Sequence, residues 1–161
     1  AYKYYNMKMK KKIFTIFLLM FLSSCGYEAI HSKKNAIKYN FSIQEINFSG
    51  DRDINLKIKE KLNNYSSSKK DKKFILKISS TSKKIISSKN ISGNATSYKN
   101  TITISVETLM NNKLKNSFII IENFNYNNNN NKFDLKRYEK EIIENLTETA
   151  SDKIIFKLFK I

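Results

Sequence analysis

The sequence predicts a single α/β (α+β) domain in residues 41–161, a two-layer sandwich with two helices covering a four-stranded, mostly antiparallel sheet. Three observations predict this fold. Several segments alternate hydrophobic and polar residues, as half-buried strands do. Two other segments repeat hydrophobic residues every three or four positions, as helices do. Three strand segments follow one another with short turns between them, which favours an antiparallel meander.

Residues 1–24 are predicted to be upstream residues and a lipoprotein signal peptide, outside the domain. Four lysines between positions 8 and 12 form a basic head, and an apolar run follows at 13–22. Ten apolar residues are too few for a helix that spans a bilayer, but they suit the core of a secretory signal. Residues 1–6 precede Met7 and Met9, so we expect translation to start at one of these methionines.

The apolar run ends in Leu22-Ser23-Ser24-Cys25, which matches the bacterial lipobox that a signal peptidase recognises. By this likeness, the Cys25 thiol takes a diacylglyceryl group, the chain is cut before Cys25, and the new amino terminus is acylated. Two acyl chains give stable attachment, since each buried methylene contributes about 0.8 kcal/mol. Gly26 resembles the outer-membrane default at the sorting position, where Asp retains many lipoproteins in the inner membrane. Residues 25–40 lack periodicity and are predicted to be a lipidated tether.

The domain is predicted to begin with a strand at residues 41–49, with a bulge near Glu45 where the apolar spacing is irregular. Gly50-Asp51 predicts a turn, and Asp51 or Asp53 can cap the helix that follows. The helix is predicted from four apolar residues at spacings of 4, 4 and 3: Ile54, Ile58, Leu62 and Tyr65.

Three strands are predicted next. The second begins at Phe74 and can continue past a Ser/Thr stretch through Ile86, before a turn region at residues 90–100. The third, at residues 101–107, has the clearest alternation. Asn111-Asn112-Lys113 predicts the next turn, and residues 118–126 form the fourth strand. Four of its residues are expected on one face: Phe118, Ile120, Phe124 and Tyr126.

The last element is predicted to be a long helix at residues 135–158, after a run of five asparagines at 127–131 that is predicted to be a hairpin or loop. Its apolar positions recur at spacings of 3, 4, 4, 4, 4 and 4: Leu135, Tyr138, Ile142, Leu146, Ala150, Ile154 and Leu158.

The chain is strongly basic, with a net charge of +16 over 161 residues. Removing residues 1–24 and their five lysines leaves 25 basic and 14 acidic residues, or +11. Such a surplus favours anionic partners. Codon bias in an AT-rich genome, together with solubility, gives an equally good account, because Lys, Ile, Asn and Ser dominate the composition.

Residues for catalysis or metal binding are scarce, so we expect no catalytic site, no metal and no cofactor besides the acyl lipid on Cys25. His31 is the single histidine and lies in the predicted tether. Three glycines give no phosphate-binding loop. The export signal also directs the chain away from nucleic acid. The abundant polyanions of the envelope are phosphorylated lipids, so Lys83, Lys84 and Lys89 are the candidate contacts to lipopolysaccharide (LPS) phosphates, with a solvated loop as the alternative.

The layout resembles the LPS-assembly lipoprotein family, LptE, also called RlpB. The resemblance is carried by the lipobox followed by Gly26-Tyr27, by the strand ending at Gly50-Asp51-Arg52 where a helix begins, and by the closing pattern of residues 146–158 (LTETASDKIIFKL). It implies a non-enzymatic lipoprotein on the periplasmic face of the outer membrane. Such a protein plugs the LPS-translocon β-barrel, LptD, helps to assemble it, and binds LPS.

An alternative is an accessory lipoprotein of another envelope machine, either a lipid-transport ABC system or a cell-wall synthase. Many small α/β lipoproteins share this architecture, and fold does not determine function. An enzyme is the least favoured class, because the residues for it are missing.

Overall fold

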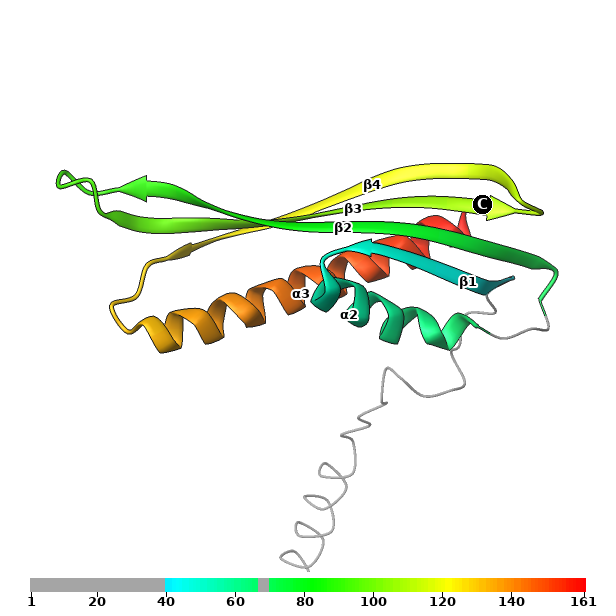
Figure 1. The fold of residues 1–161 in the computed structure, drawn as a ribbon, viewed down its shortest axis with the longest axis horizontal. Coiled ribbons are helices and arrows are strands. Elements are labelled where there is room, and N and C mark those ends of the chain that lie inside the picture. Colours follow the sequence, from blue (N-terminus) through cyan, green and yellow to red (C-terminus); the bar gives the residue numbers. More distant parts are fainter. Residues whose placement is uncertain (1–39, 67–69) are drawn as a thin grey trace, which may run out of the picture. The chain divides into compact units, whose positions relative to one another are not determined.

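The computed structural model describes residues 40–66 and 70–161. The predicted signal peptide, the lipobox with Cys25, and residues 26–39 of the predicted tether lie outside the described residues. The elements, drawn in Figure 1, are β1 (Phe41–Gly50), α2 (Arg52–Leu62), a short 3-10 helix η2 (Asn63–Tyr65), β2 (Lys72–Lys89), β3 (Ala95–Met110), β4 (Lys113–Asn127) and α3 (Lys132–Phe159).

The four strands form one open sheet in the order β1-β2-β3-β4. β1 runs parallel to β2, while β2, β3 and β4 form an antiparallel meander. α2 is the crossover between the two parallel strands, and both helices lie on the same side of the sheet (Figure 1). The predicted fold class, a mostly antiparallel four-stranded sheet covered by two helices, is therefore confirmed.

The first strand and the first helix meet at a corner that tolerates only glycine. Gly50 has a φ of +89°, and a Cβ built on it would lie 1.9 Å from the Ser80 carbonyl oxygen. The amide of Asp51 donates to that same oxygen at 3.0 Å. The Asp51 side chain caps α2 by accepting from the amides of Asp53 and Ile54. The sequence had left Asp51 and Asp53 open as caps, and the structure assigns the role to Asp51.

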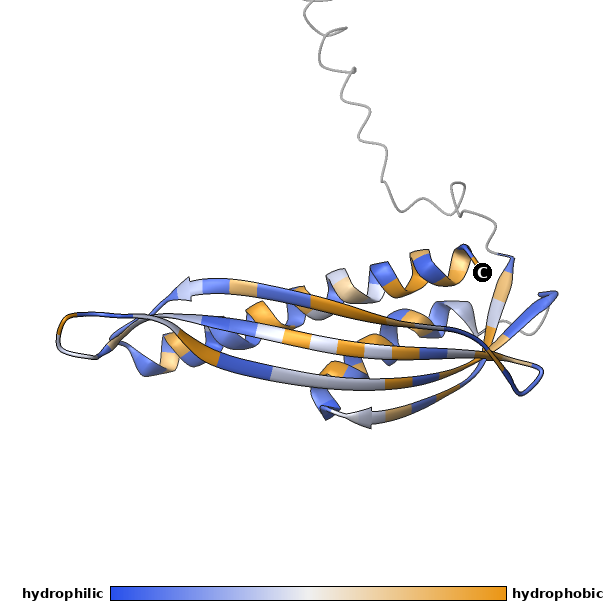
Figure 2. Cartoon of the chain, turned by 90° about the horizontal axis from the view of Figure 1, so that it is seen from above, coloured by the Kyte–Doolittle hydropathy of each residue, from blue (hydrophilic) through white to orange (hydrophobic). Residues whose placement is uncertain are grey.

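The core lies between the sheet and the two helices, where apolar residues from both layers are withdrawn from solvent. Its largest fully buried side chains include Phe74, Leu76 and Ile78 of β2, Ile102, Ile104 and Val106 of β3, Ile54, Ile58 and Leu62 of α2, and Ile154 and Leu158 of α3. Seen from above in Figure 2, the strands alternate between hydrophobic and hydrophilic residues along their length. This alternation is what buries one face of the sheet and leaves the other in water.

Several element boundaries differ from those predicted. Residues 95–100 were predicted to be turn, which is wrong: β3 begins at Ala95, because Ala95 already pairs with β2 and the residues from Ser97 onward also pair with β4. The first helix ends at Leu62, and its last predicted turn tightens into η2. Phe124 and Tyr138 carry the expected periodicity but are 46% and 44% exposed, because no further layer covers them.

Candidate functional site

The most unusual part of the described chain is the far end of the β2–β3 hairpin, which runs past α2 and along α3, with its tip turn projecting beyond the start of α3 (Figure 1). We call residues 83–101 the distal arm and the paired residues 74–82 and 102–110 the covered half. The distal arm contains four lysines, Lys83, Lys84, Lys89 and Lys99, and no Asp or Glu. Every residue from 83 to 94 is exposed. The arm is therefore a protruding cationic surface.

The distal arm also exposes apolar side chains. Ile85 and Ile86 are 44% and 49% exposed, and Ile91 at the tip is fully exposed. Gly93 completes the tip turn with a φ of +81°, and a Cβ on it would meet open space. Isolated exposed isoleucines are common, but three of them among four lysines make this surface amphipathic. A phosphorylated amphiphile presents the complementary chemistry.

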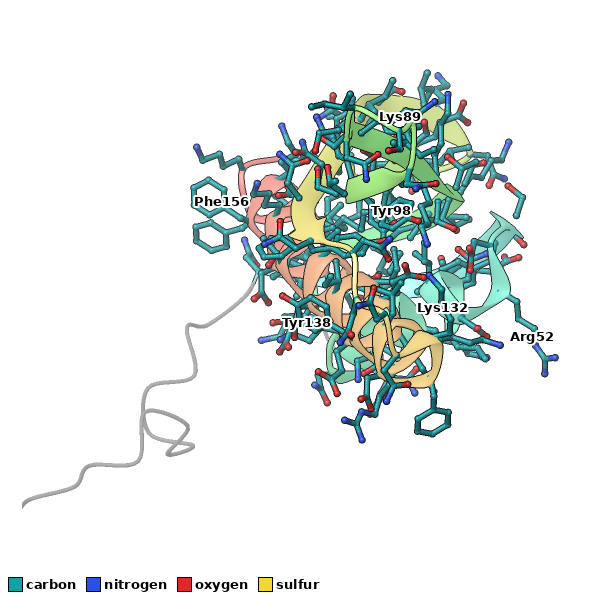
Figure 3. The ribbon with its side chains drawn as sticks, turned by 90° about the vertical axis from the view of Figure 1, so that its left-hand side faces the viewer. Arg52, Lys89, Tyr98, Lys132, Tyr138 and Phe156 are labelled. Atoms are coloured by element: carbon teal, nitrogen blue, oxygen red, sulfur yellow. The ribbon has the colours of Figure 1, made fainter. Side chains whose placement is uncertain are left out.

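The three lysines that the sequence nominated for phosphate contacts do not form one cluster. Successive residues of a strand point to opposite faces, so Lys83 and Lys84 lie on opposite sides of the arm. Lys84 pairs with Glu139 of α3, and its ammonium lies 4.1 Å from the centre of the Tyr98 ring. Lys89 ends β2 close to the tip, as Figure 3 shows from the tip end. Because Lys84 already pairs with Glu139, Lys83 and Lys89 are the better candidates, and a contact of any of the three with LPS stays a prediction.

A small aromatic cluster holds the base of the distal arm to α3. The rings of Tyr98 and Tyr126 lie 5.8 Å apart, and Tyr138 meets Tyr126 edge-on at 6.0 Å. The Tyr126 hydroxyl donates to Glu139 at 2.9 Å. Burial raises the pKa of Tyr126 well above its ordinary 10.0, and this hydrogen bond raises it further. The hydroxyl therefore stays protonated and serves as a structural donor.

A groove of about 710 Å³ opens between α2, α3 and the middle of β2. Ile54, Leu56 and Ile143 form its apolar wall. Carboxylates such as Glu139 and Glu144 line it together with several lysines, so the groove favours neither sign of charge. A nearby ion pair couples the helices further along, where Lys61 reaches Glu148 at 3.3 Å and Asp152 at 3.2 Å.

The pKa of Lys61 shows that these contacts outweigh desolvation. Burial lowers this pKa, while hydrogen bonds to Asp152 and Glu148 raise it, and the net shift is upward. The side chains of Lys61, Glu148 and Asp152 are largely exposed, so these two ion pairs contribute little to stability. We interpret them as a clamp between α2 and α3 rather than as chemistry.

Residues 40–66 and 70–161 hold no group of three or more His, Cys, Asp or Glu side chains placed to bind a metal ion. No helix within these ranges combines the length and the apolar character that crossing a membrane requires. Sequence reasoning missed the cluster of Tyr98, Tyr126 and Glu139. Its residues lie on three elements, and no local spacing brings them together.

No family model and no curated protein sequence matches the chain. Solved structures do. Rare lipoprotein B from Shewanella oneidensis matches with a TM-score of 0.56 and 13% identity, over 71% of this chain and 92% of that one. A minor lipoprotein from Acinetobacter baumannii matches with a TM-score of 0.59 and 11% identity, over 76% and 92%. Lipoprotein B from Nitrosomonas europaea gives 0.55 and 13%, over 73% and 83%.

These matches span nearly the whole of the Shewanella and Acinetobacter chains, so they concern the complete domain. Hydrophobic periodicity predicted this architecture, sequence motifs suggested the resemblance to LptE, or RlpB, and the structural likeness supports both. The described part of this chain has the fold of the rare lipoprotein B structures.

Proposed function

We propose that this chain is an outer-membrane lipoprotein, anchored on the periplasmic face through acyl chains on Cys25. In this proposal it assembles with the LPS-translocon β-barrel LptD, plugs its lumen, and aids LPS transport to the outer leaflet. The observation that carries the proposal is the shared fold with rare lipoprotein B, in a chain that also has a lipobox ahead of the domain.

The fold suits this role physically. The domain is a two-layer sandwich held by a main core and a smaller second cluster, so it can fill a wide barrel as a rigid body. Its basic surplus suits a lumen through which phosphorylated glycolipid passes. In the distal arm, four lysines and three exposed isoleucines occur together, and the arm itself contains no carboxylate.

The first test is depletion of the protein, followed by assays of surface LPS and of barrel maturation. We expect both to fall, and crosslinking in intact cells to capture an outer-membrane β-barrel. Cys25→Ser removes the lipidated thiol, so it should reproduce the depletion. Ser24→Ala is the matched control, because a small residue remains at the cut site. Co-purification with an inner-membrane transporter or a synthase, without a barrel, would select the alternative function.

A second test asks whether the distal arm contacts LPS. Lys83→Gln with Lys89→Gln removes two exposed charges from the arm. Lys113→Gln with Lys115→Gln removes two exposed charges from the other end of the sheet. We expect the arm variant to weaken binding of purified LPS and to flatten its salt dependence, while the control pair does neither. An equal loss of LPS binding in both variants would mean that the arm contributes only as part of a general cationic surface.

A further inference from the structure

We propose that the free edge of β4 pairs with the β4 edge of a second copy of this chain, antiparallel about a two-fold axis centred at Ile120. The inference goes beyond the proposed function and does not depend on it. It rests on three features of β4. Its edge is less protected than the other edge of the sheet, its residues are compatible with those of a second antiparallel β4, and the same register brings Lys157 of one copy towards Glu122 of the other.

The edge of β4 is less protected against strand pairing than the other edge of the sheet, because its lysines and its register shift lie at its start and Lys153 pairs the charge of Glu122. β4 lies at one end of the sheet, so one side of its backbone has no strand partner among the described elements. From Asn116 to Asn127 it pairs with β3 without interruption and contains no proline. Ile119 and Ile121 project from its open face, 62% and 59% exposed. Natural edges are more often short, bulged or charged at their centre.

The opposite edge of the sheet shows what a protected edge looks like. β1 has ten residues against fifteen in β4. A register shift between Ile43 and Glu45 interrupts it, and Glu45 is exposed there. A bulge and a charge in mid-strand both oppose pairing. The sequence thus guards one edge and leaves the other able to accept a strand.

Antiparallel pairing about Ile120 places each residue of β4 opposite a compatible one. Ile119 of each copy lies opposite the partner's Ile121, which forms a four-isoleucine cluster on the open face. Ser117 lies opposite the partner's Asn123. The lysines at the start of β4, Lys113 and Lys115, meet the asparagine-rich end of the other strand rather than each other. Like charges directly opposite would destabilise a pair, and this register has none.

The helix side supplies the charge complementarity. In this register Phe118 lies opposite the partner's Glu122. The ammonium of Lys157 already lies 5.2 Å from the centre of the Phe118 ring. Each Lys157 would therefore approach the partner's Glu122. Within one copy, Glu122 already forms an ion pair with Lys153. Phe156 is 59% exposed, and Figure 3 shows it projecting on the side where β4 lies, so it can add apolar contact.

Site-specific disulfide crosslinking tests the register directly. Two differently tagged full-length chains, both carrying Cys25→Ser, receive Ser117→Cys and Asn123→Cys respectively. Opposite residues of a strand pair lie within disulfide reach, so the mixture should form the mixed dimer on oxidation. Ser117→Cys alone should stay uncrosslinked, because the two copies of residue 117 would lie about 20 Å apart. Efficient crosslinking of Ser117→Cys to itself, or none in the mixture, would overturn the proposed register.

Analytical ultracentrifugation of the full-length chain carrying Cys25→Ser tests the dimer itself. Ile119→Lys with Ile121→Lys should weaken the dimer by more than about tenfold, since four lysines would replace the isoleucine cluster. Ile85→Lys changes a strand isoleucine that is 44% exposed and lies away from β4, so it is the control and should leave the dimer intact. A monomer at every concentration, or open-ended aggregates in place of a defined dimer, would refute a closed two-fold pair.

Discussion

The two ends of the β2–β3 hairpin are both paired antiparallel, but they differ in the regularity of that pairing and in their surroundings. In the covered half, Leu76, Ile78 and Ile104 are fully buried under α2 and α3. In the distal arm, the isoleucines are exposed, and lysines occupy positions on both faces. Antiparallel pairing keeps the arm extended despite two register shifts between Ile86 and Lys89, whereas the covered half is paired without a shift and packed against the helices. The comparison suggests that the covered half provides most of the stability, while the arm carries the exposed surface proposed to contact LPS.

The largest expected effect comes from the corner at Gly50, which packs against Ser80 of the covered half. Gly50→Ala should lower the free energy of unfolding by about 4 kcal/mol or more, because the new methyl would overlap the Ser80 carbonyl and the φ is positive. Gly93→Ala at the arm tip should cost only about 1 kcal/mol, since space is open there. Urea denaturation followed by circular dichroism measures both, and equal losses would contradict the proposed corner.

The next largest expected difference is in the free energy of unfolding when one isoleucine in each region is shortened to alanine. Ile104→Ala in the covered half removes a fully buried side chain and should cost about 3 kcal/mol. Ile85→Ala in the distal arm removes one that is 44% exposed and should cost less than about 1 kcal/mol. Thermal and urea unfolding of both variants would check this. A large loss at Ile85 would mean that the arm is packed rather than exposed.

A smaller effect is expected at the boundary between the regions. The Asp51 side chain caps α2 and also accepts from the Ser82 hydroxyl at 2.8 Å. Asp51→Ala should therefore destabilise the domain by about 1 kcal/mol. Asp53 is exposed and has no capping role, so Asp53→Ala should cost only a few tenths of a kcal/mol through the helix dipole. If the two variants unfold at the same urea concentration, the cap assignment is wrong.

The smallest expected effect is a dependence on pH at the base of the arm. Burial and Glu139 raise the pKa of Tyr126, so folding favours its protonated hydroxyl. The stability from this group is fully present below pH 10.0 and declines as pH rises above it, since the unfolded tyrosine then ionises more readily. Tyr126→Phe should flatten that decline, and Tyr138→Phe is the control. Unfolding midpoints between about pH 8 and 11 test it.

Local signals allowed much of the fold to be predicted. The Asp51 cap, the bulge near Glu45 and the Asn111-Asn112 turn all follow from residue chemistry, and the structure confirms each. Both asparagines of that turn have positive φ, which this residue tolerates. Strand order could not be derived, because hydrophobic periodicity does not specify neighbours. The start of β3 was missed because residues 95–100 do not alternate between buried and exposed side chains, although they pair as a strand.

The candidate site was less predictable for a related reason. Lys83 and Lys84 are adjacent in sequence, yet the pleat separates them, and only Lys84 reaches Glu139 and Tyr98. A charge cluster in a sequence shows that lysines are present but not which of them remains available. The face of the sheet on which each lysine lies depends on the strand register. The ion pair of Lys84 depends on Glu139, which lies in a helix more than fifty residues away.

Parallel pairing of the first two strands has a consequence for the order of events during synthesis. Residues 41–50 are made well before residues 72–80, with which they pair, whereas β2, β3 and β4 can zip together through short turns. The nascent first strand therefore waits without a partner while α2 forms behind it. Its brevity and its bulge limit premature association during that interval, and docking of β1 should be among the last steps of folding.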